Sequence, residues 1–179
     1  MASPRNTCFH LAFILLVLNV LHLFARTSAT PLNDVCNKVS DRTFCLNNFG
    51  SNPKTRNANL PLLGQIAIDR VQGDGAAISN RIQSLRLVAV YPILKTLLIR
   101  CESEYVLTLN ELMTATDDLK NRRYGDLRLH AAWAVDTAER CESGFKRPYF
   151  SPITSENRIF KNLGEILVVI ADNLNSGKH

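Results

Sequence analysis

The sequence predicts an all-α protein, a four-helix up-and-down bundle with an N-terminal helical hairpin and two disulfides. Apolar residues recur every three or four positions over most of the chain, which is the spacing of amphipathic helices. Alternation of apolar and polar residues, which is typical of strands, nowhere exceeds four residues. Four cysteines follow an N-terminal targeting segment, and this even number indicates a disulfide framework formed in an oxidising compartment.

Residues 1–29 have the three parts of a secretory signal peptide. Arg5 makes the start positive, residues 9–24 are largely apolar, and Thr27-Ser28-Ala29 supplies small residues for cleavage after Ala29. An uncleaved membrane anchor is the alternative, but the apolar run is short for a span and contains two histidines and an asparagine. Cleavage leaves residues 30–179 as one domain of ordinary size. Cys8 is lost with the leader.

The charge of this domain is mild. The chain has 21 Lys+Arg and 16 Asp+Glu, and the leader contributes only Arg5 and Arg26, so residues 30–179 carry a net charge of +3. The basic residues are scattered between acids, which argues against a nucleic-acid partner. A weak preference for an acidic, wall-like surface is allowed. No later segment is apolar enough to span a bilayer, so no membrane partner is expected after cleavage.

The hairpin is predicted over residues 33–50. Asp34 and the pair Ser40-Asp41 are possible N-caps, and residues 50–53 (Gly-Ser-Asn-Pro) form a stop signal. Neither helical turn is long enough to be stable alone in water. A disulfide between Cys36 and Cys45 is therefore expected to hold the two turns together.

The bundle is predicted over residues 59–174. Its first helix begins after Asn59, and Gly73-Asp74-Gly75 is expected to kink or fray it, because two glycines cost about 2 kcal/mol relative to alanine in a helix. A second helix covers residues 92–120. A third carries alanines on its apolar face, which would let a neighbour approach closely, and ends at Gly144. The last begins with Thr154 as N-cap, and residues 175–179 are expected to be a disordered tail.

The second cysteine pair lies on the two helices that flank the link at residues 121–125. Counted from Arg123, Cys101 is 22 residues back and Cys141 is 18 residues forward. At about 1.5 Å per residue, the two arms of an antiparallel pair differ by only ~6 Å. Of the three possible connectivities, this favours Cys101–Cys141 and leaves Cys36–Cys45 as the local pair.

The motifs of the chain resemble those of the plant invertase/pectin methylesterase inhibitor family. The resemblance covers almost all of residues 30–179 and rests on the cysteine spacing and on two motifs, C-E-x-G-F at residues 141–145 and S-P-I-T-x-x-N at residues 151–157. It implies a four-helix bundle behind a helical hairpin, with the first cysteine joined to the second and the third to the fourth. It also implies an extracellular or vacuolar protein inhibitor that binds one carbohydrate-active enzyme molecule.

The resemblance leaves two targets open, pectin methylesterase and acid invertase. Invertase inhibitors of the family typically carry Pro-Lys-Phe before the helix of the fourth cysteine, and residues 123–126 here are Arg-Tyr-Gly-Asp. The Tyr-x-Asp pattern resembles the pectin methylesterase inhibitors, whereas the whole chain resembles a branch named by homology after invertase. In an invertase complex the link would enter the sucrose site; in an esterase complex exposed bundle helices would cover the pectin cleft. The candidate partner-binding residues are Arg122, Arg123, Tyr124, Gly125 and Asp126.

No residue pattern indicates catalysis, a metal or a cofactor. His130 stands alone on a helix and is expected to be a packing or surface residue, and Asp117-Asp118 is interpreted as a solvated helix face. Paired cysteines and the absence of C-x-x-C or H-x-x-x-H argue against zinc. Two alternatives to an inhibitor stay open: an allergen-like secreted protein of the same fold without inhibitory activity, and a small-ligand carrier. Secretion to the apoplast is the expected destination, ahead of the vacuole.

Overall fold

The computed structural model describes residue 17 and residues 30–177. Residues 1–30 form a unit of their own, so the account below concerns the chain from Pro31 onward. The predicted signal peptide lies outside the described residues, apart from Val17, and stays a prediction. Within the described ranges, no helix is both long and apolar enough to cross a membrane.

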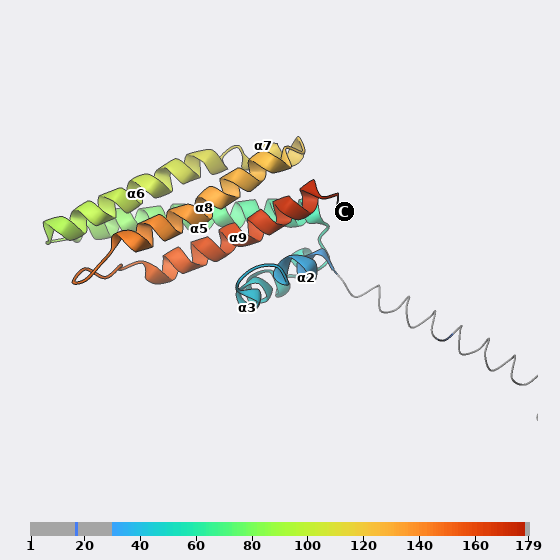
Figure 1. Ribbon diagram of the computed structural model, residues 1–179, viewed down its shortest axis with the longest axis horizontal. Helices are drawn as coiled ribbons and strands as arrows, with labels where there is room; N and C mark the ends of the chain where they lie inside the picture. Colours follow the sequence, from blue (N-terminus) through green and yellow to red (C-terminus); the bar gives the residue numbers. More distant parts are fainter. Residues whose placement is uncertain (1–16, 18–29, 178–179) are drawn as a thin grey trace, which may run out of the picture. The chain divides into compact units, whose positions relative to one another are not determined.

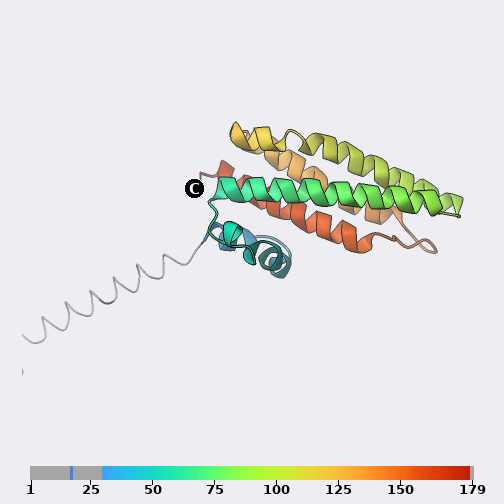
Figure 2. The ribbon, with the colours of Figure 1, turned by 180° about the vertical axis from the view of Figure 1, so that it is seen from behind.

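Four long helices make the bundle: α5 (Leu60–Val88), α6 (Pro92–Leu112), α8 (Tyr124–Gly144) and α9 (Thr154–Asn175). Figures 1 and 2 show them side by side, with successive helices running in opposite directions. α5 packs against α6 and α9, and α8 packs against the same two helices. The predicted four-helix up-and-down bundle is therefore confirmed, and no strand occurs in the part of the chain from residue 30 to residue 177.

A group of short helices precedes the bundle: α2 (Pro31–Cys36), α3 (Arg42–Cys45), the π-helical turn η1 (Leu46–Gly50) and α4 (Pro53–Arg56). Asp41 caps α3 by accepting from the Phe44 amide, as predicted, whereas Asp34 lies inside α2 and is not its cap. α2 and α3 pack on α9. Hydrogen bonds from Lys38 to Asn173 and from Ser40 to Glu165 add polar contacts between the hairpin and this helix.

α5 is continuous over 29 residues, so the kink expected at Gly73-Asp74-Gly75 was wrong. Gly75 is buried, and a Cβ added there would lie 2.9 Å from Phe160 Cε2 and 3.0 Å from Leu109 Cδ2. Because Gly75 has no side chain, Leu109 of α6 and Phe160 of α9 can approach α5 closely at this position. Tertiary packing on both sides offsets the low helix propensity of glycine.

The second predicted helix is interrupted instead. α6 ends at Leu112, and the short helix α7 (Ala115–Lys120) follows after Met113 and Thr114. Thr114 Oγ1 donates to the Glu111 carbonyl at 3.0 Å, which competes with the backbone pattern of a helix. Gln72 of α5 donates to the Leu112 carbonyl at 2.7 Å, so the carbonyl exposed at the break is satisfied from a neighbouring helix.

The closest helix approach is between α8 and α9. Ala131, Ala134 and Ala138 are buried on α8, as their spacing predicted, and Gly164 faces them from α9. A Cβ at Gly164 would lie 2.9 Å from Val135 Cγ2 and 3.2 Å from the Ala131 carbonyl oxygen. The N-cap of α9 is Ile153 and not Thr154, and the helix extends to Asn175, one residue into the expected tail.

Both predicted disulfides are present. Cys36 bonds to Cys45 with a Cα–Cα distance of 5.5 Å, and Cys101 bonds to Cys141 with a Cα–Cα distance of 4.9 Å. All four cysteines are buried. The second bond spans 40 residues of sequence and joins the middle of α6 to the last turn of α8.

Replacing Gly164 by alanine is expected to lower the free energy of unfolding by about 1–3 kcal/mol, because the new Cβ meets backbone atoms of α8 that cannot rotate away. The matched control is Gly73→Ala on α5, where a Cβ meets nothing within 4 Å. That change should raise the free energy of unfolding by about 1 kcal/mol through helix propensity alone. Urea unfolding of both variants measures the difference; equal shifts would contradict the close-approach assignment.

Removing the Cys101–Cys141 bond with a double alanine variant should destabilise the protein by about 4 kcal/mol on the chain-entropy estimate. The Cys36–Cys45 bond closes a much shorter loop, so its removal should lower the free energy of unfolding by only about 3 kcal/mol. Chemical denaturation of the two double variants gives the order, and a larger loss for the Cys36–Cys45 variant would show that loop length does not set the effect.

Candidate functional site

Of the predicted partner-binding residues 122–126, the first two lie between α7 and α8, and the other three form the first turn of α8 (Figure 1). Arg122 has a φ of 58°, in the left-handed region, which turns the chain sharply between the two helices. Tyr124 is half-buried against the core, and the other four residues are exposed. We call residues 122–126 the link surface. The structure brings all five together on one short segment, at the end of α8 far from the Cys101–Cys141 bond.

Arg123 anchors this link to a buried acid. Its Nη2 lies 2.7 Å and its Nε 2.8 Å from Asp118 Oδ1, and its amide donates to the Asp118 carbonyl at 2.8 Å. Asp118 is only 3% exposed, so its interpretation as part of a solvated helix face was wrong. A buried carboxylate needs such a cation, because an unpaired charge away from water is strongly unfavourable. Arg123 is therefore part of the scaffold as well as of the exposed link surface.

His130 belongs to the same cluster. Its Nε2 lies 3.1 Å from Asp118 Oδ2 and 3.2 Å from Thr114 Oγ1, and its Nδ1 lies 3.7 Å from Glu111 Oε2. A catalytic triad needs the acid and the hydroxyl on different ring nitrogens, and here both approach Nε2. The arrangement connects the start of α8 to the break between α6 and α7, which agrees with the packing role expected for this histidine.

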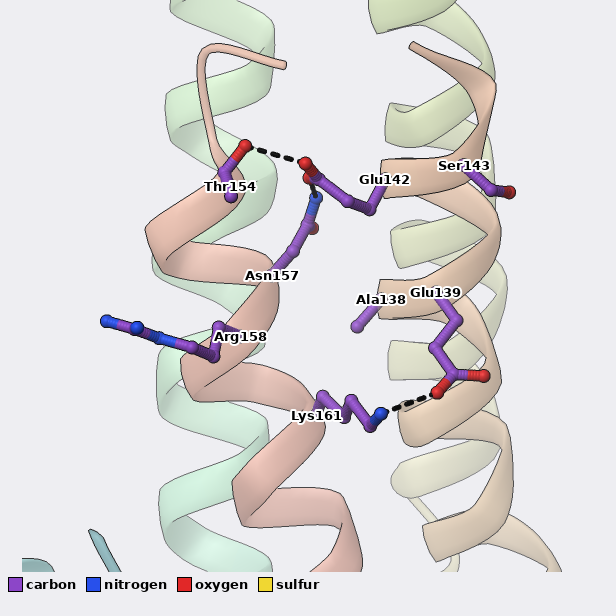
Figure 3. A pocket seen from close by; sticks show the side chains of 8 residues that line it. All are labelled: Ala138, Glu139, Glu142, Ser143, Thr154, Asn157, Arg158 and Lys161. Atoms are coloured by element: carbon purple, nitrogen blue, oxygen red, sulfur yellow. Dashed lines mark hydrogen bonds and ion pairs between the residues drawn. The ribbon is translucent and has the colours of Figure 1, made fainter. Parts of the chain in front are cut away.

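The two family-like motifs meet at the opposite end of α8. Glu142 accepts hydrogen bonds from Thr154 Oγ1 at 2.6 Å and from Asn157 Nδ2 at 2.7 Å (Figure 3). Asn157 Oδ1 in turn accepts from the Tyr105 hydroxyl at 2.8 Å. Burial, followed by the charges of Glu156 and Glu142, raises the pKa of Tyr105 above its usual range, so this phenol stays a donor. The motifs thus connect α6, α8 and α9 beside the Cys101–Cys141 bond and do not form a reactive site.

An open groove of about 370 Å³ runs between α8 and α9 beside this network. Lys161 donates to Glu139 across it at 2.7 Å, and this bond raises the pKa of the lysine. Arg158 points away from the α8 side chains in Figure 3. Over the described residues, no group of three His, Cys, Asp or Glu side chains is placed to hold a metal ion. The groove therefore combines an open shape with charged side chains from both helices.

A second exposed surface lies on α6 and α8, and sequence reasoning missed it. Large apolar side chains there are more than two-fifths exposed although they belong to well-packed helices. The sequence did contain an indication of this surface, because these apolar residues fall between the helix positions that form the buried stripe. We call this set the α6–α8 face, and its members are Ile99, Val106, Leu107, Leu129 and Trp133 on the two helices and Met113 directly after α6.

Comparison with known proteins agrees with these features. The family model described as "Plant invertase/pectin methylesterase inhibitor" matches residues 30–170. A protein of Platanus orientalis named "Putative invertase inhibitor" is 30% identical over 84% of this chain and 93% of its own length. A protein of Actinidia deliciosa named "Pectinesterase inhibitor" is 29% identical over 98% of both chains.

The fold also matches solved structures. The crystal structure of a mutant form of a pectin methylesterase inhibitor from Arabidopsis superposes with a TM-score of 0.74, at 24% identity, over 80% of this chain and 97% of that one. This likeness concerns the fold, and the match of the family model across residues 30–170 gives the relationship. The chain belongs to the plant invertase/pectin methylesterase inhibitor family.

Proposed function

We propose that the protein is a secreted inhibitor that binds a plant pectin methylesterase or acid invertase one to one and covers its substrate cleft. The observation that carries this proposal is the match of the inhibitor family model to residues 30–170, on a chain that has both disulfides of the expected framework. The two kinds of target appear in the names of its relatives. Secretion to the apoplast is supported by the signal-peptide pattern of residues 1–29 and by the disulfides.

Inhibition by occlusion suits a rigid surface. Binding loses free energy whenever side chains and loops must be ordered in the complex. Here the Cys101–Cys141 bond and the hydrogen bonds of Glu142 and Asn157 hold three helices together before any partner arrives. The free protein therefore has its contact surfaces already formed, and little of the interaction energy is used for ordering.

The two candidate targets correspond to two surfaces. The link surface is short and charged, and four of its five residues are exposed at the turn into α8, which suits insertion into a small sucrose pocket. The α6–α8 face presents apolar side chains over two helices, which suits contact across an extended cleft, because the buried centre of an interface is rich in apolar groups. The absence of Pro-Lys-Phe and the Tyr124-Gly125-Asp126 pattern favour the esterase. Pectin methylesterase is therefore the first target we propose, and acid invertase the second.

Titration of a plant pectin methylesterase and a plant acid invertase with the purified, oxidised protein tests the proposal. The esterase should lose activity in proportion to added protein and reach a plateau at one equivalent. Mass spectrometry of the secreted product should show that the chain begins at Thr30. Full activity of both enzymes at excess protein would contradict the inhibitor function and favour a non-inhibitory member of the fold.

Surface variants separate the two targets. Leu107→Asp and Trp133→Ala on the α6–α8 face should weaken esterase inhibition by more than tenfold and invertase inhibition by less than twofold, because apolar contacts at the centre of an interface carry most of its energy. Arg122→Glu on the link surface should show the opposite selectivity. Inhibition constants for both enzymes measure the effects.

The control variant is Lys54→Glu on α4, an exposed charge reversal away from both surfaces. Arg123 is left unchanged, because reversing it would place two acids beside each other at buried Asp118 and destabilise the fold. Equal weakening of both enzymes by Arg122→Glu would contradict the assignment of the link surface to invertase.

A further inference from the structure

One end of the bundle exposes an unusual number of large apolar side chains. The turn between α5 and α6 and the loop between α8 and α9 lie at this end (Figures 1 and 2). The rings of Tyr91 and Tyr149, one from each segment, approach to 6.0 Å and join them. We call residues 87–93 and 145–152 the bundle tip. It lies at the end of α6 and α8 opposite to the link surface.

The exposed apolar residues of the bundle tip are not needed for the core. Ala89, Leu94 and Phe145 already pack against the core from the same segments. Their neighbours project into solvent, and Val90 is 86% and Phe150 71% exposed. A concentration of exposed apolar side chains in one place marks an interaction surface. The exposed set is Leu87, Val88, Val90, Tyr91, Ile93 and Phe150.

The charged residues within the bundle tip and its flanking turns are all basic. Residues 87–101 and 143–155 contain no acid and four cations, Lys95, Arg100, Lys146 and Arg147. The whole of residues 30–179 has a net charge of only +3, so the rest of the domain is slightly negative. Three acids border these segments. Glu102 pairs with Arg86 at 2.6 Å and Glu156 with Arg81 at 3.5 Å, whereas Glu142 accepts hydrogen bonds from the neutral groups of Thr154 and Asn157. The small net charge of the whole domain does not reveal this local concentration of cations.

The exposed apolar side chains and the basic charge of the bundle tip together indicate the kind of partner. A second copy of the chain would bring four like charges against four, which opposes association of two tips. A hydrated polyanion would neutralise the cations but leave aliphatic side chains such as Val88, Val90 and Ile93 in water. An anionic lipid bilayer satisfies both, because apolar side chains enter the interface while lysine and arginine meet the headgroups.

We propose that the bundle tip binds the surface of an anionic lipid bilayer, lying on it without spanning it. The Glu142–Thr154 hydrogen bond joins α8 to α9 beside the second segment, and the Tyr91–Tyr149 ring contact joins the two segments, so their apolar residues are presented together. The link surface then points away from the bilayer. This inference does not depend on which enzyme the protein inhibits.

Vesicle co-sedimentation with the secreted, oxidised protein tests the proposal, after mass spectrometry has shown that residues 1–29 are absent. Binding is expected to vesicles of phosphatidylcholine with about one third phosphatidylglycerol, to weaken strongly in high salt, and to be lost on phosphatidylcholine alone. Lys146→Glu with Arg147→Glu should reduce affinity by more than twentyfold, since each cation near an anionic bilayer contributes about fivefold. Val90→Asp with Phe150→Asp should abolish binding.

Leu107→Asp on the α6–α8 face is the matched control and should bind vesicles like the parent protein. Insertion is checked with Phe150→Trp in a Trp133→Phe background, because Trp133 is the chain's one tryptophan, so fluorescence then reports the tip alone. A blue shift on anionic vesicles supports insertion. The proposal is overturned if vesicles do not bind, if the Asp variants bind as well as the parent, or if only soluble polygalacturonate binds, which would make the tip a polyanion site.

Discussion

The connection of α6, α8 and α9 beside the Cys101–Cys141 bond is the constraint on which the other features depend. The disulfide fixes two helices at one level, and the Tyr105–Asn157–Glu142–Thr154 chain of hydrogen bonds brings in the third. Small residues on α8 and Gly164 on α9 allow the close approach that these bonds require. A buried polar network of this kind is favourable only when every member has a partner, as here.

That constraint leaves both ends of the bundle free to differ. At one end, the Asp118–Arg123 pair and His130 hold the link without a disulfide. At the other end, two loops expose apolar and basic side chains that the core does not use. The lateral α6–α8 face is a third surface. A rigid scaffold with separate surfaces suits a protein whose function is to contact other molecules and not to transform them.

The sequence predicted the bundle, the hairpin and both disulfides, because periodicity and cysteine spacing are local properties. It misjudged features that depend on neighbours distant in the sequence. Gly75 was predicted to break the helix, but it lies where Phe160 and Leu109 pack too closely for a side chain. Asp118 looked solvated because its burial and its contact with His130 arise only when α8 packs against α7. The break after Leu112 depends on Gln72 from another helix. Exposed apolar surfaces were missed because periodicity shows which residues are buried and not which apolar residues remain outside.

The anchoring of Arg123 to Asp118 has a consequence for how such a protein diversifies. Two residues of the link hold it to the fold, Arg123 through its pair with Asp118 and Tyr124 by packing against the core. Arg122, Gly125 and Asp126 are exposed on the same segment. If the link surface binds the target as proposed, substitutions at those three exposed positions would change what it recognises and leave the buried core unchanged. A few substitutions that do not disturb the fold could then change one enzyme target for another. Membership of the family alone would therefore not identify the target of a single member.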